Sequence, residues 1–268
     1  MTATRLDARY TREVRDFLLK DPVGNVFPIG VFEQWGLAAV HGGTWLGCVR
    51  GDGALAAVVY AGPKDTLGRA SIAVAMGEPS DCIALGEAVA RQGGAAWVIG
   101  EDVQSDALWR GLGNPAARVN SSQVLMHIEA TTEGDTIACR VAERGDLPWV
   151  LSVAHAQLKE DLGVDESRIL APEVALAGEF VGEHEQRRVY RAKLATQCSA
   201  GVQVGGVWVD PLYRNRGFGQ AGTRGLIRPL LDRFPRVTLH VRTDNAAAIQ
   251  CYERVGFKRE RAFRVLVR

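Results

Sequence analysis

The sequence predicts an α+β protein built from two domains. The chain has 268 residues, a length that allows one large or two modest domains. Short apolar runs of strand length alternate with helix-like runs, and both halves have the same order: helices, hairpin, strand, helix, strand, helix, strand. A polar joint, Thr131 to Asp135, separates the two halves. We therefore expect domains at residues 1–133 and 134–268.

The first half shows clear local signals for its elements. Residues 7–20 are expected to be helical because Val14, Phe17 and Leu18 recur at helical spacing. The sequence Gly51-Asp52-Gly53 between two apolar runs predicts a β-hairpin. The other elements expected in this half are helix 29–36, strands 44–50, 54–60 and 70–76, helix 80–91, strand 96–99, helix 105–111 and strand 122–129.

The second half repeats this order. Its first long helix is expected at 147–159, with Asp146 as N-cap and Pro148 in the first turn. The other elements expected here are strand 136–141, helix 173–181, strands 187–195 and 201–209, a helix to 233, strand 237–241, a helix from 245 and strand 261–267.

Composition excludes several classes of protein. The chain is 47% apolar and 24% charged, as is usual for soluble globular proteins. It has no apolar run long enough to span a membrane, and its charged N-terminus does not resemble a signal peptide. The five cysteines are scattered without a Cys-x-x-Cys spacing, so we expect reduced thiols, a cytoplasmic protein and no metal site.

Charge is distributed unevenly between the halves. Residues 1–133 contain 11 Lys and Arg against 15 Asp and Glu, whereas residues 134–268 contain 21 against 16. A basic second half favours an anionic ligand. Nucleic acid is not expected, because no recognised binding motif accompanies this charge.

A glycine-rich turn in the second half predicts an anion-binding site. The strand 204–209 is followed by the turn Arg214-Asn215-Arg216-Gly217-Phe218-Gly219, and a helix begins at once. The unpaired N–H groups of a helix start attract anions, and glycine allows close approach to them. The spacing fits neither a P-loop nor a dinucleotide-binding fingerprint. The alternative interpretation is a solvated turn.

A second motif lies downstream, at residues 245–257: Asn-Ala-Ala-Ala-Ile-Gln-Cys-Tyr-Glu-Arg-Val-Gly-Phe. Together, the Arg-x-x-Gly-x-Gly turn and this segment resemble the GCN5-related N-acetyltransferase (GNAT) superfamily. The resemblance implies a central, mostly antiparallel twisted sheet flanked by helices in each domain. The first half has no such turn: its counterpart, 75–82, carries two acidic residues. We therefore expect a degenerate N-terminal domain that binds no coenzyme.

The resemblance also implies a function. The superfamily transfers an acyl group, most often acetyl, from a coenzyme A thioester to an amine. The acceptor here is expected to be a primary amine of a small molecule or a protein, and acetyl-CoA the cofactor. The positions implied to contact the coenzyme are Val207, Trp208, Val209, Arg214, Arg216, Gly217, Phe218, Gly219, Gln220, Asn245 and Tyr252. Strand alternation turns the Trp208 side chain away from its neighbours, which favours a core position for the indole.

Tyr252, Asn245 and the pair Gly205-Gly206 carry more specific expectations. Tyr252 is implied to be the general acid for the leaving thiolate, whereas the alternative is a ring that only packs between helix and sheet. Asn245 is expected both to cap its helix and to contact the coenzyme. Gly205-Gly206 can permit a strand bulge that frees N–H groups for the thioester, or can simply mark a tight strand crossing.

The general base is not evident from the motif. Gln203 stands where many relatives have a glutamate, and an amide can hold a water or an amine but cannot take the proton. Charged residues of the expected acceptor loops are candidates, although such residues are usually only solvated. They are Glu160, Asp161, Glu179, Glu183, His184 and Glu185, of which Glu160, Asp161 and Glu183 are expected to bind substrate.

A different class of function is also compatible with the sequence. Gln203 and the degenerate first half favour a coenzyme A-binding sensor or interaction protein with little catalysis. With either function, the first half can serve as a lid or as a dimerisation module, so a homodimer is a possible assembly.

Overall fold

The computed structural model describes residues 3–38, 41–162 and 175–268, and the chain divides into two compact units. Unit 1 contains Met1–Leu125 and Glu260–Arg268, and unit 2 contains Met126–Arg259. Helices and a mostly antiparallel sheet confirm the α+β class. The boundary expected after residue 133 stays a prediction about independently folding domains. The C-terminal strand belongs to unit 1.

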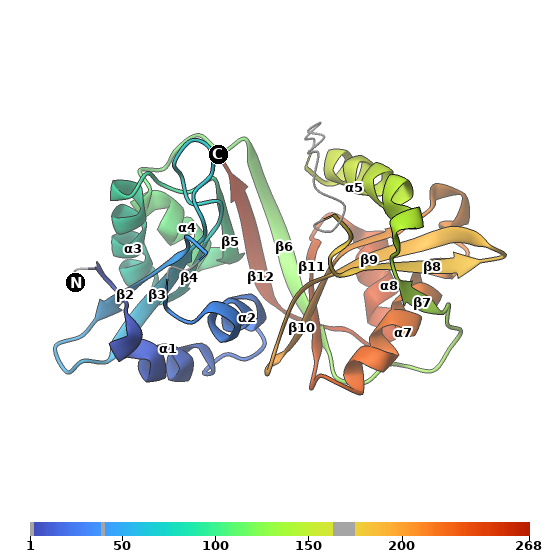
Figure 1. Ribbon diagram of the computed structural model, residues 1–268, viewed down its shortest axis with the longest axis horizontal. Helices are drawn as coiled ribbons and strands as arrows, with labels where there is room; N and C mark the ends of the chain where they lie inside the picture. Colours follow the sequence, from blue (N-terminus) through green and yellow to red (C-terminus); the bar gives the residue numbers. More distant parts are fainter. Residues whose placement is uncertain (1–2, 39–40, 163–174) are drawn as a thin grey trace. The chain divides into compact units, whose positions relative to one another are not determined.

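Unit 1 is a sheet with the strand order β1-β2-β3-β4-β5-β12, covered by helices (Figure 1). Its strands pair antiparallel, except for β4 with β5. The elements are β1 (Ala3–Arg5), η1 (Ala8–Tyr10), α1 (Thr11–Leu18), α2 (Val26–Trp35), β2 (Thr44–Val49), β3 (Leu55–Ala61), β4 (Ala73–Gly77), α3 (Pro79–Arg91), β5 (Trp97–Glu101), α4 (Asp102–Gly111) and β12 (Lys258–Val267). Strand β6 (Val119–Ile128) leads from unit 1 into unit 2.

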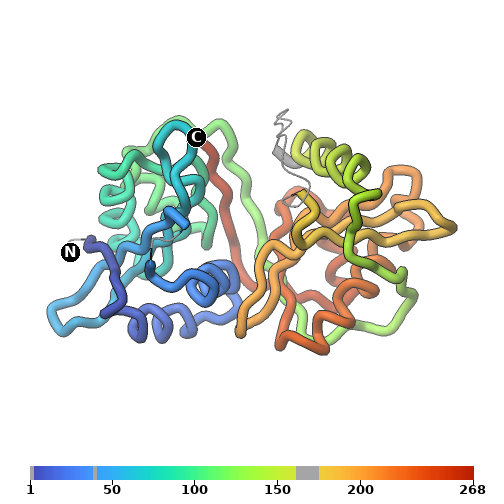
Figure 2. Tube along the Cα trace, in the orientation of Figure 1, coloured from blue at the N-terminus to red at the C-terminus, as the bar shows by residue number. Residues whose placement is uncertain are grey.

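The last strand of the chain completes unit 1. β12 pairs antiparallel with β5 from Phe263↔Glu101 to Val267↔Trp97. Its Arg261 forms ion pairs with Asp21 at 2.7 Å and with Glu101 at 3.6 Å. The C-terminal segment, red in Figure 2, is therefore held in unit 1 both by backbone pairing and by charge.

Unit 2 is a sheet with the strand order β7-β8-β9-β10-β11, in which only β10 and β11 run parallel. Its elements are β7 (Cys139–Val141), η2 (Arg144–Asp146), α5 (Leu147–Leu162), β8 (Glu179–His184), β9 (Arg187–Cys198), β10 (Gly201–Val209), η3 (Pro211–Tyr213), α7 (Phe218–Leu231), β11 (Val237–Arg242) and α8 (Ala246–Val255). No helix among the described residues is long and apolar enough to cross a membrane.

The helix expected at 173–181 is wrong at its end, while residues 175–176 are helical. Residues 179–181, expected to be helical, belong to strand β8, which pairs with both β7 and β9. Residues 173–174 of that expected helix lie outside the described residues. A short apolar run does not distinguish strand from helix, and here pairing on both edges decides the outcome.

Neighbouring residues of β9 point to opposite faces of the sheet and meet different helices. Tyr190 lies under α7, where a Cβ built on Gly222 would come within 2.4 Å of its ring. Its hydroxyl lies 3.2 Å from Thr223 Oγ1. Arg191 points the other way and reaches Gln157 of α5 at 3.0 Å. Thus α7 and α5 cover opposite faces of the sheet in unit 2.

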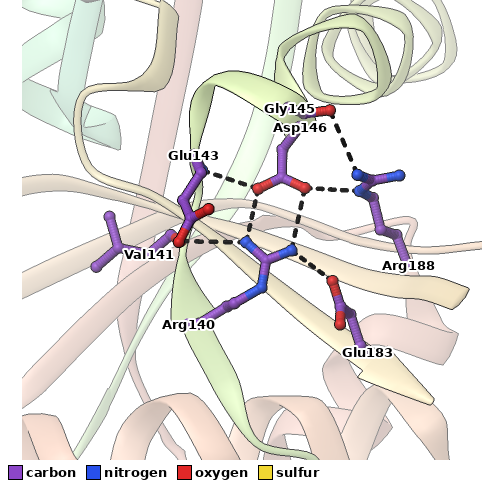
Figure 3. A network of polar contacts seen from close by, with 7 residues as sticks. All are labelled: Arg140, Val141, Glu143, Gly145, Asp146, Glu183 and Arg188. Carbon is purple, nitrogen blue, oxygen red and sulfur yellow. Dashed lines mark hydrogen bonds and ion pairs between the residues drawn. The ribbon is translucent and has the colours of Figure 1, made fainter. Parts of the chain in front are cut away.

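A charged cluster ties η2 to the sheet (Figure 3). Asp146 is almost fully buried and accepts from Arg140 and from Arg188 Nε, each at 2.6 Å. It also accepts from the backbone N–H of Glu143. Arg140 in turn pairs with Glu183. Mainly through its hydrogen bonds, Arg140 holds the pKa of Asp146 well below its usual range, so the carboxylate stays ionised in the folded protein.

We predict that Gly222→Ala destabilises unit 2. The added methyl group would overlap the Tyr190 ring, which is fully buried. Overpacking costs about 1–3 kcal/mol, against a gain of about 1 kcal/mol in helix propensity. Thermal unfolding should show a lower Tm. Gly145→Ala is the control, because its Cβ would meet nothing within 4 Å. Equal Tm values for the two variants would contradict the packing described.

We also predict a pH-dependent effect of Asp146→Asn. Because the pKa of Asp146 is lower in the folded than in the unfolded state, its stabilisation is full above the unfolded pKa near 3.8, begins to fall below that value, and is lost only as pH falls through the lower folded pKa. Removing one partner of a buried ion pair costs about 3–5 kcal/mol. Urea unfolding should therefore show a large difference from wild type at pH 7 that shrinks towards pH 3. Exposed Glu133, changed to Gln, should show a difference near zero at both pH values. A difference for Asp146→Asn that does not change with pH would rule out this linkage.

Candidate active site

The two parallel strands of unit 2 separate partway along their length. β10 pairs with β11 only at Val202↔Val237, Gln203↔Thr238 and Val204↔Leu239. Both strands continue, to Val209 and to Arg242, without further paired positions. The backbone groups on the facing edges of these continuations are thereby released from sheet pairing, so they can bind a ligand.

On its other edge, β10 contains the expected bulge. Gly205 pairs with Lys193 and Trp208 pairs with Arg191, so β10 has one residue more than β9 between these positions. Gly206 has φ of 58°, a left-handed conformation that glycine adopts without strain. A Cβ on Gly205 would meet nothing within 4 Å, so this side of the strand is open. The two glycines therefore do more than mark a tight strand crossing.

The bend after β10 ends in an uncapped helix start. Gly217 is the N-cap of α7 with φ of 84°, and no side chain caps the helix. The amides of the first turn therefore lack helical acceptors and lie at the positive end of the dipole. The residues from Arg214 to Gly217 are exposed, and nothing lies within 4 Å of a Cβ built on Gly217. This geometry suits an anion that approaches from solvent.

The two arginines of the bend have different surroundings. Arg214 donates to the Val209 carbonyl at 3.1 Å and pairs with Glu160 of α5 at 3.3 Å. Arg216 lies over the rings of Tyr213 and Phe218, each at 5.5 Å, and has no carboxylate partner among the described residues. Arg216 is thus the more available cation of the pair.

Helix α8 packs beside this helix start. A Cβ on Gly219 would lie 3.2 Å from Cys251 Sγ, which brings α8 against the first turn of α7. Asn245 is confirmed as the cap of α8, because its Oδ1 accepts from Ala248 N at 3.1 Å. Tyr252 is buried, with 7% of its surface exposed, and its ring lies 5.6 Å from that of Phe257.

The remaining coenzyme positions expected from the sequence lie along the same path. Val207 and Val209 are half-buried on the part of β10 that has no partner on β11, and Gln220 lies in the first turn of α7. The Trp208 indole is half-buried and packs edge-on against Trp149 of α5 at 6.0 Å, so it lies at the edge of the core. The Trp208 backbone remains part of strand β10, where it pairs with Arg191.

The described candidate bases are held in ion pairs or at the surface. Glu160 pairs with Arg214, and Glu183 pairs with Arg140. Gln203, which cannot itself act as a base, is half-buried in the part of β10 that pairs with β11. Glu185 is exposed at the tip of the β8–β9 hairpin. The side chain of Asp161 lies outside the described residues.

Two contacts near the site were not expected from the sequence. Glu179 and Arg191 form a buried ion pair at 2.7 Å. Arg191 lies within a run that is otherwise apolar and fully buried, 189–192, and a charge in such a run was the available signal. His184 packs edge-on against Phe218 at 4.8 Å, so the end of β8 reaches the start of α7.

On β11, burial lowers the pKa of His240 to about 4, which leaves a neutral imidazole at pH 7.

Unit 1 has a similar strand arrangement with different charges. β4 and β5 are parallel and share one paired position, Ala73↔Val98. A cavity of about 150 Å³ lies beside these strands, with Asp21, Glu101 and Gln104 in its lining. The following helix, α3, has Glu78 as N-cap and a second acidic residue in its first turn. Carboxylates at this helix start oppose the binding of phosphate.

Comparison with known proteins agrees with this geometry. Residues 140–257 match the model of the acetyltransferase (GNAT) family. One curated relative, the N-alpha-acetyltransferase RimI of Mycobacterium tuberculosis, is 52% identical over 56 residues, 20% of this chain and 32% of that protein. The mycothiol acetyltransferase of a Nocardioides species is 30% identical over 144 residues, 52% of this chain and 44% of that protein. The chain thus spans less than half the length of these curated relatives.

Solved structures support the fold. A GCN5-related N-acetyltransferase from Sphaerobacter thermophilus has a TM-score of 0.60 at 14% identity, covering 99% of this chain and 94% of that one. A Drosophila protein reaches 0.69 at 11% identity, covering 99% and 98%. Identities this low bear on the fold alone. The match of residues 140–257 to the GNAT family model agrees with the diverging strands, the bulge and the uncapped helix start found in the same stretch.

Proposed function

We propose that unit 2 transfers an acetyl or other short acyl group from coenzyme A to a primary amine. One observation carries the proposal: an uncapped, glycine-lined helix start directly follows a bulged strand that has separated from its parallel neighbour. A site of this shape offers backbone donors both to a diphosphate and to a thioester. The names of the two curated relatives, an N-alpha-acetyltransferase and a mycothiol acetyltransferase, support acetyl transfer.

The residues at the helix start fit coenzyme A. The amides from Arg216 to Gln220 would take the diphosphate, because the region is exposed and a Cβ at Gly217 would point into open space. Arg216 would add a charge-assisted hydrogen bond. Val207 and Val209 would lie along the pantetheine arm, and Asn245 would contact the coenzyme next to its capping bond. When bound, the coenzyme supplies the acyl group as an activated thioester.

The protein would then stabilise the charge that develops on the thioester oxygen and transfer the protons that the reaction requires. Transfer forms an amide bond to the amine nitrogen and breaks the carbon–sulfur bond. Amides of the β10 bulge would donate to the thioester oxygen as it gains negative charge. Tyr252 would give its phenolic proton to the leaving thiolate and recover one from solvent. Gln203 would hold the amine, or a water that takes the amine proton to solvent, because an amide cannot itself accept the proton.

Unit 1 has another proposed role. Its acidic helix start favours a degenerate domain of the same kind that binds no coenzyme. It would serve as a lid or as a dimerisation module, and the acceptor amine would belong to a small molecule or to a protein.

A sensor that binds coenzyme A without catalysis is the second candidate. The observation in its favour is that Glu160, Glu179 and Glu183 are all in ion pairs with arginine. The two candidates differ in one assay: release of free thiol from acetyl-CoA over a panel of primary amines, beside calorimetry with the same ligand. Binding without release for any amine favours the sensor, and absence of binding excludes both.

We predict that Arg216→Ala weakens coenzyme A binding about tenfold or more, because a charge-assisted hydrogen bond contributes about 1.5–3 kcal/mol. Calorimetry with coenzyme A and with pantetheine isolates the effect, since pantetheine has no diphosphate. Its affinity should not change. Equal losses for both ligands would show that Arg216 acts through the fold of the bend and not on the diphosphate.

We predict that Tyr252→Phe lowers kcat about 100-fold or more while the Kd for coenzyme A stays unchanged. Phenylalanine preserves the buried ring but removes the proton, and general acid catalysis contributes about 10²–10⁴-fold. Thiol release with the best amine of the panel measures the effect. Tyr10→Phe, the same change in unit 1, is the control. Wild-type turnover in Tyr252→Phe would reduce Tyr252 to a packing residue.

A further inference from the structure

The bulge in β10 lies against a buried ion pair. Arg191 of β9 donates to Glu179 of β8 through Nε at 2.8 Å and through Nη2 at 2.7 Å. The two side chains are 6% and 1% exposed. A pair so deeply desolvated is a poor source of stability, although its two-pronged geometry fixes the guanidinium rigidly.

The remaining nitrogen of this guanidinium points to the bulge. Nη1 donates to Gln157 Oε1 at 3.0 Å and approaches the Gly206 carbonyl oxygen at 3.5 Å. A Cβ on Gly206 would lie 3.2 Å from the same nitrogen. Gly206 is therefore required both for its left-handed backbone and for the close approach of Arg191.

Gln157 extends the contact to the next residue. Its Nε2 donates to the Val207 carbonyl at 3.3 Å while its Oε1 accepts from Arg191. Both carbonyl groups within the bulge thus face a side-chain donor. Gly206 and Val207 have no partner position on β9, and β10 has no partner position on β11 beyond Val204. The Arg191 and Gln157 side chains therefore occupy both of these carbonyl groups on the side of α5.

We propose that Gln157 and Arg191 are positioning residues for acyl transfer. By holding the carbonyl groups of Gly206 and Val207 on the side of α5, they orient the bulge so that its N–H groups donate to the thioester oxygen. Neither side chain needs to touch the acyl group. The proposal deepens the function proposed above and rests on it.

Helix α5 connects the contacts of Gln157 and Arg191 at the bulge to the bend proposed to bind the diphosphate. Three residues after Gln157, on the same helix face, Glu160 pairs with Arg214 at 3.3 Å. The Glu160 carbonyl also accepts from Arg242 at the end of β11 at 3.1 Å. One helix therefore contacts the bulge, the bend before α7 and the end of β11. The position of α5 would then set the spacing between the sites proposed for the acyl group and the diphosphate.

The test uses the full chain with Gln157→Met and Gln157→Glu. Methionine keeps length and helix propensity but loses both hydrogen bonds, and glutamate keeps the acceptor for Arg191 but loses the donor to Val207. Gln197→Met, at an exposed position of β9, is the matched control. Thermal unfolding establishes that each variant is folded.

The measurements distinguish an effect on the orientation of the thioester from an effect on the affinity for acetyl-CoA. We expect a Kd for acetyl-CoA within about twofold of wild type by calorimetry, and a kcat at least about tenfold lower, since loss of an oriented donor costs up to 10²–10³-fold. Infrared spectra of bound acetyl-CoA labelled with ¹³C at the thioester carbonyl should show a stretch shifted to lower frequency in wild type and in Gln197→Met. In both Gln157 variants the stretch should move back towards its solution value.

A wild-type carbonyl frequency and a wild-type kcat in either Gln157 variant would overturn the proposal and leave the acetyltransferase function intact. If wild type binds acetyl-CoA without turnover, the infrared shift alone decides, and its loss in the variants supports the proposal. If wild type does not bind acetyl-CoA, the proposed function and this inference both fail.

Discussion

The extra residue in β10 is the constraint on which the rest of the site depends. A regular strand would pair with β9 along its whole length and keep its backbone groups within the sheet. The added residue at the bulge breaks this register, and the left-handed Gly206 makes the break possible without strain. The Arg191–Glu179 pair, Gln157 and helix α5 are then arranged around a deformation that ordinary sheet pairing would oppose.

Local signals in the sequence were sufficient for most of the fold. The β2–β3 hairpin, strand β12 and the cap at Asn245 follow from turn residues, from periodicity and from capping chemistry, all of which act within a few residues. Strand β8 did not follow, although β9 is joined to it by a short turn, because its other edge pairs with β7, about 40 residues earlier in the sequence. The helix predicted at 173–181 was therefore wrong at residues 179–181.

The site was predictable to the same extent. Gly217, Gly219 and Asn245 belong to contiguous motifs, so the helix starts could be located from the chain alone. The ion pair of Glu179 with Arg191 was not predictable as a pair, since the partners lie on different strands and meet only when the sheet forms. The partner of Glu160 could not be inferred either, because Arg214 is 54 residues away.

The two units show how one element order can carry different electrostatics. In each, a strand that pairs in parallel with its neighbour is followed by a helix. In unit 2 that helix begins with glycine and exposed arginines, whereas in unit 1 it begins with Glu78. The two helix starts therefore differ in charge, and a negative charge at the start of a helix disfavours an anion there.

The placement of β12 has a consequence for how the chain is made. Unit 2 is one uninterrupted stretch, Met126–Arg259, whereas unit 1 needs Glu260–Arg268 in addition to its first 125 residues. During synthesis, the edge of β5 that pairs with β12 therefore stays unpaired until residues 126–259 and the β12 strand have been translated. The unit that is begun first can be finished only last, and the stretch in the middle has the opportunity to fold before it.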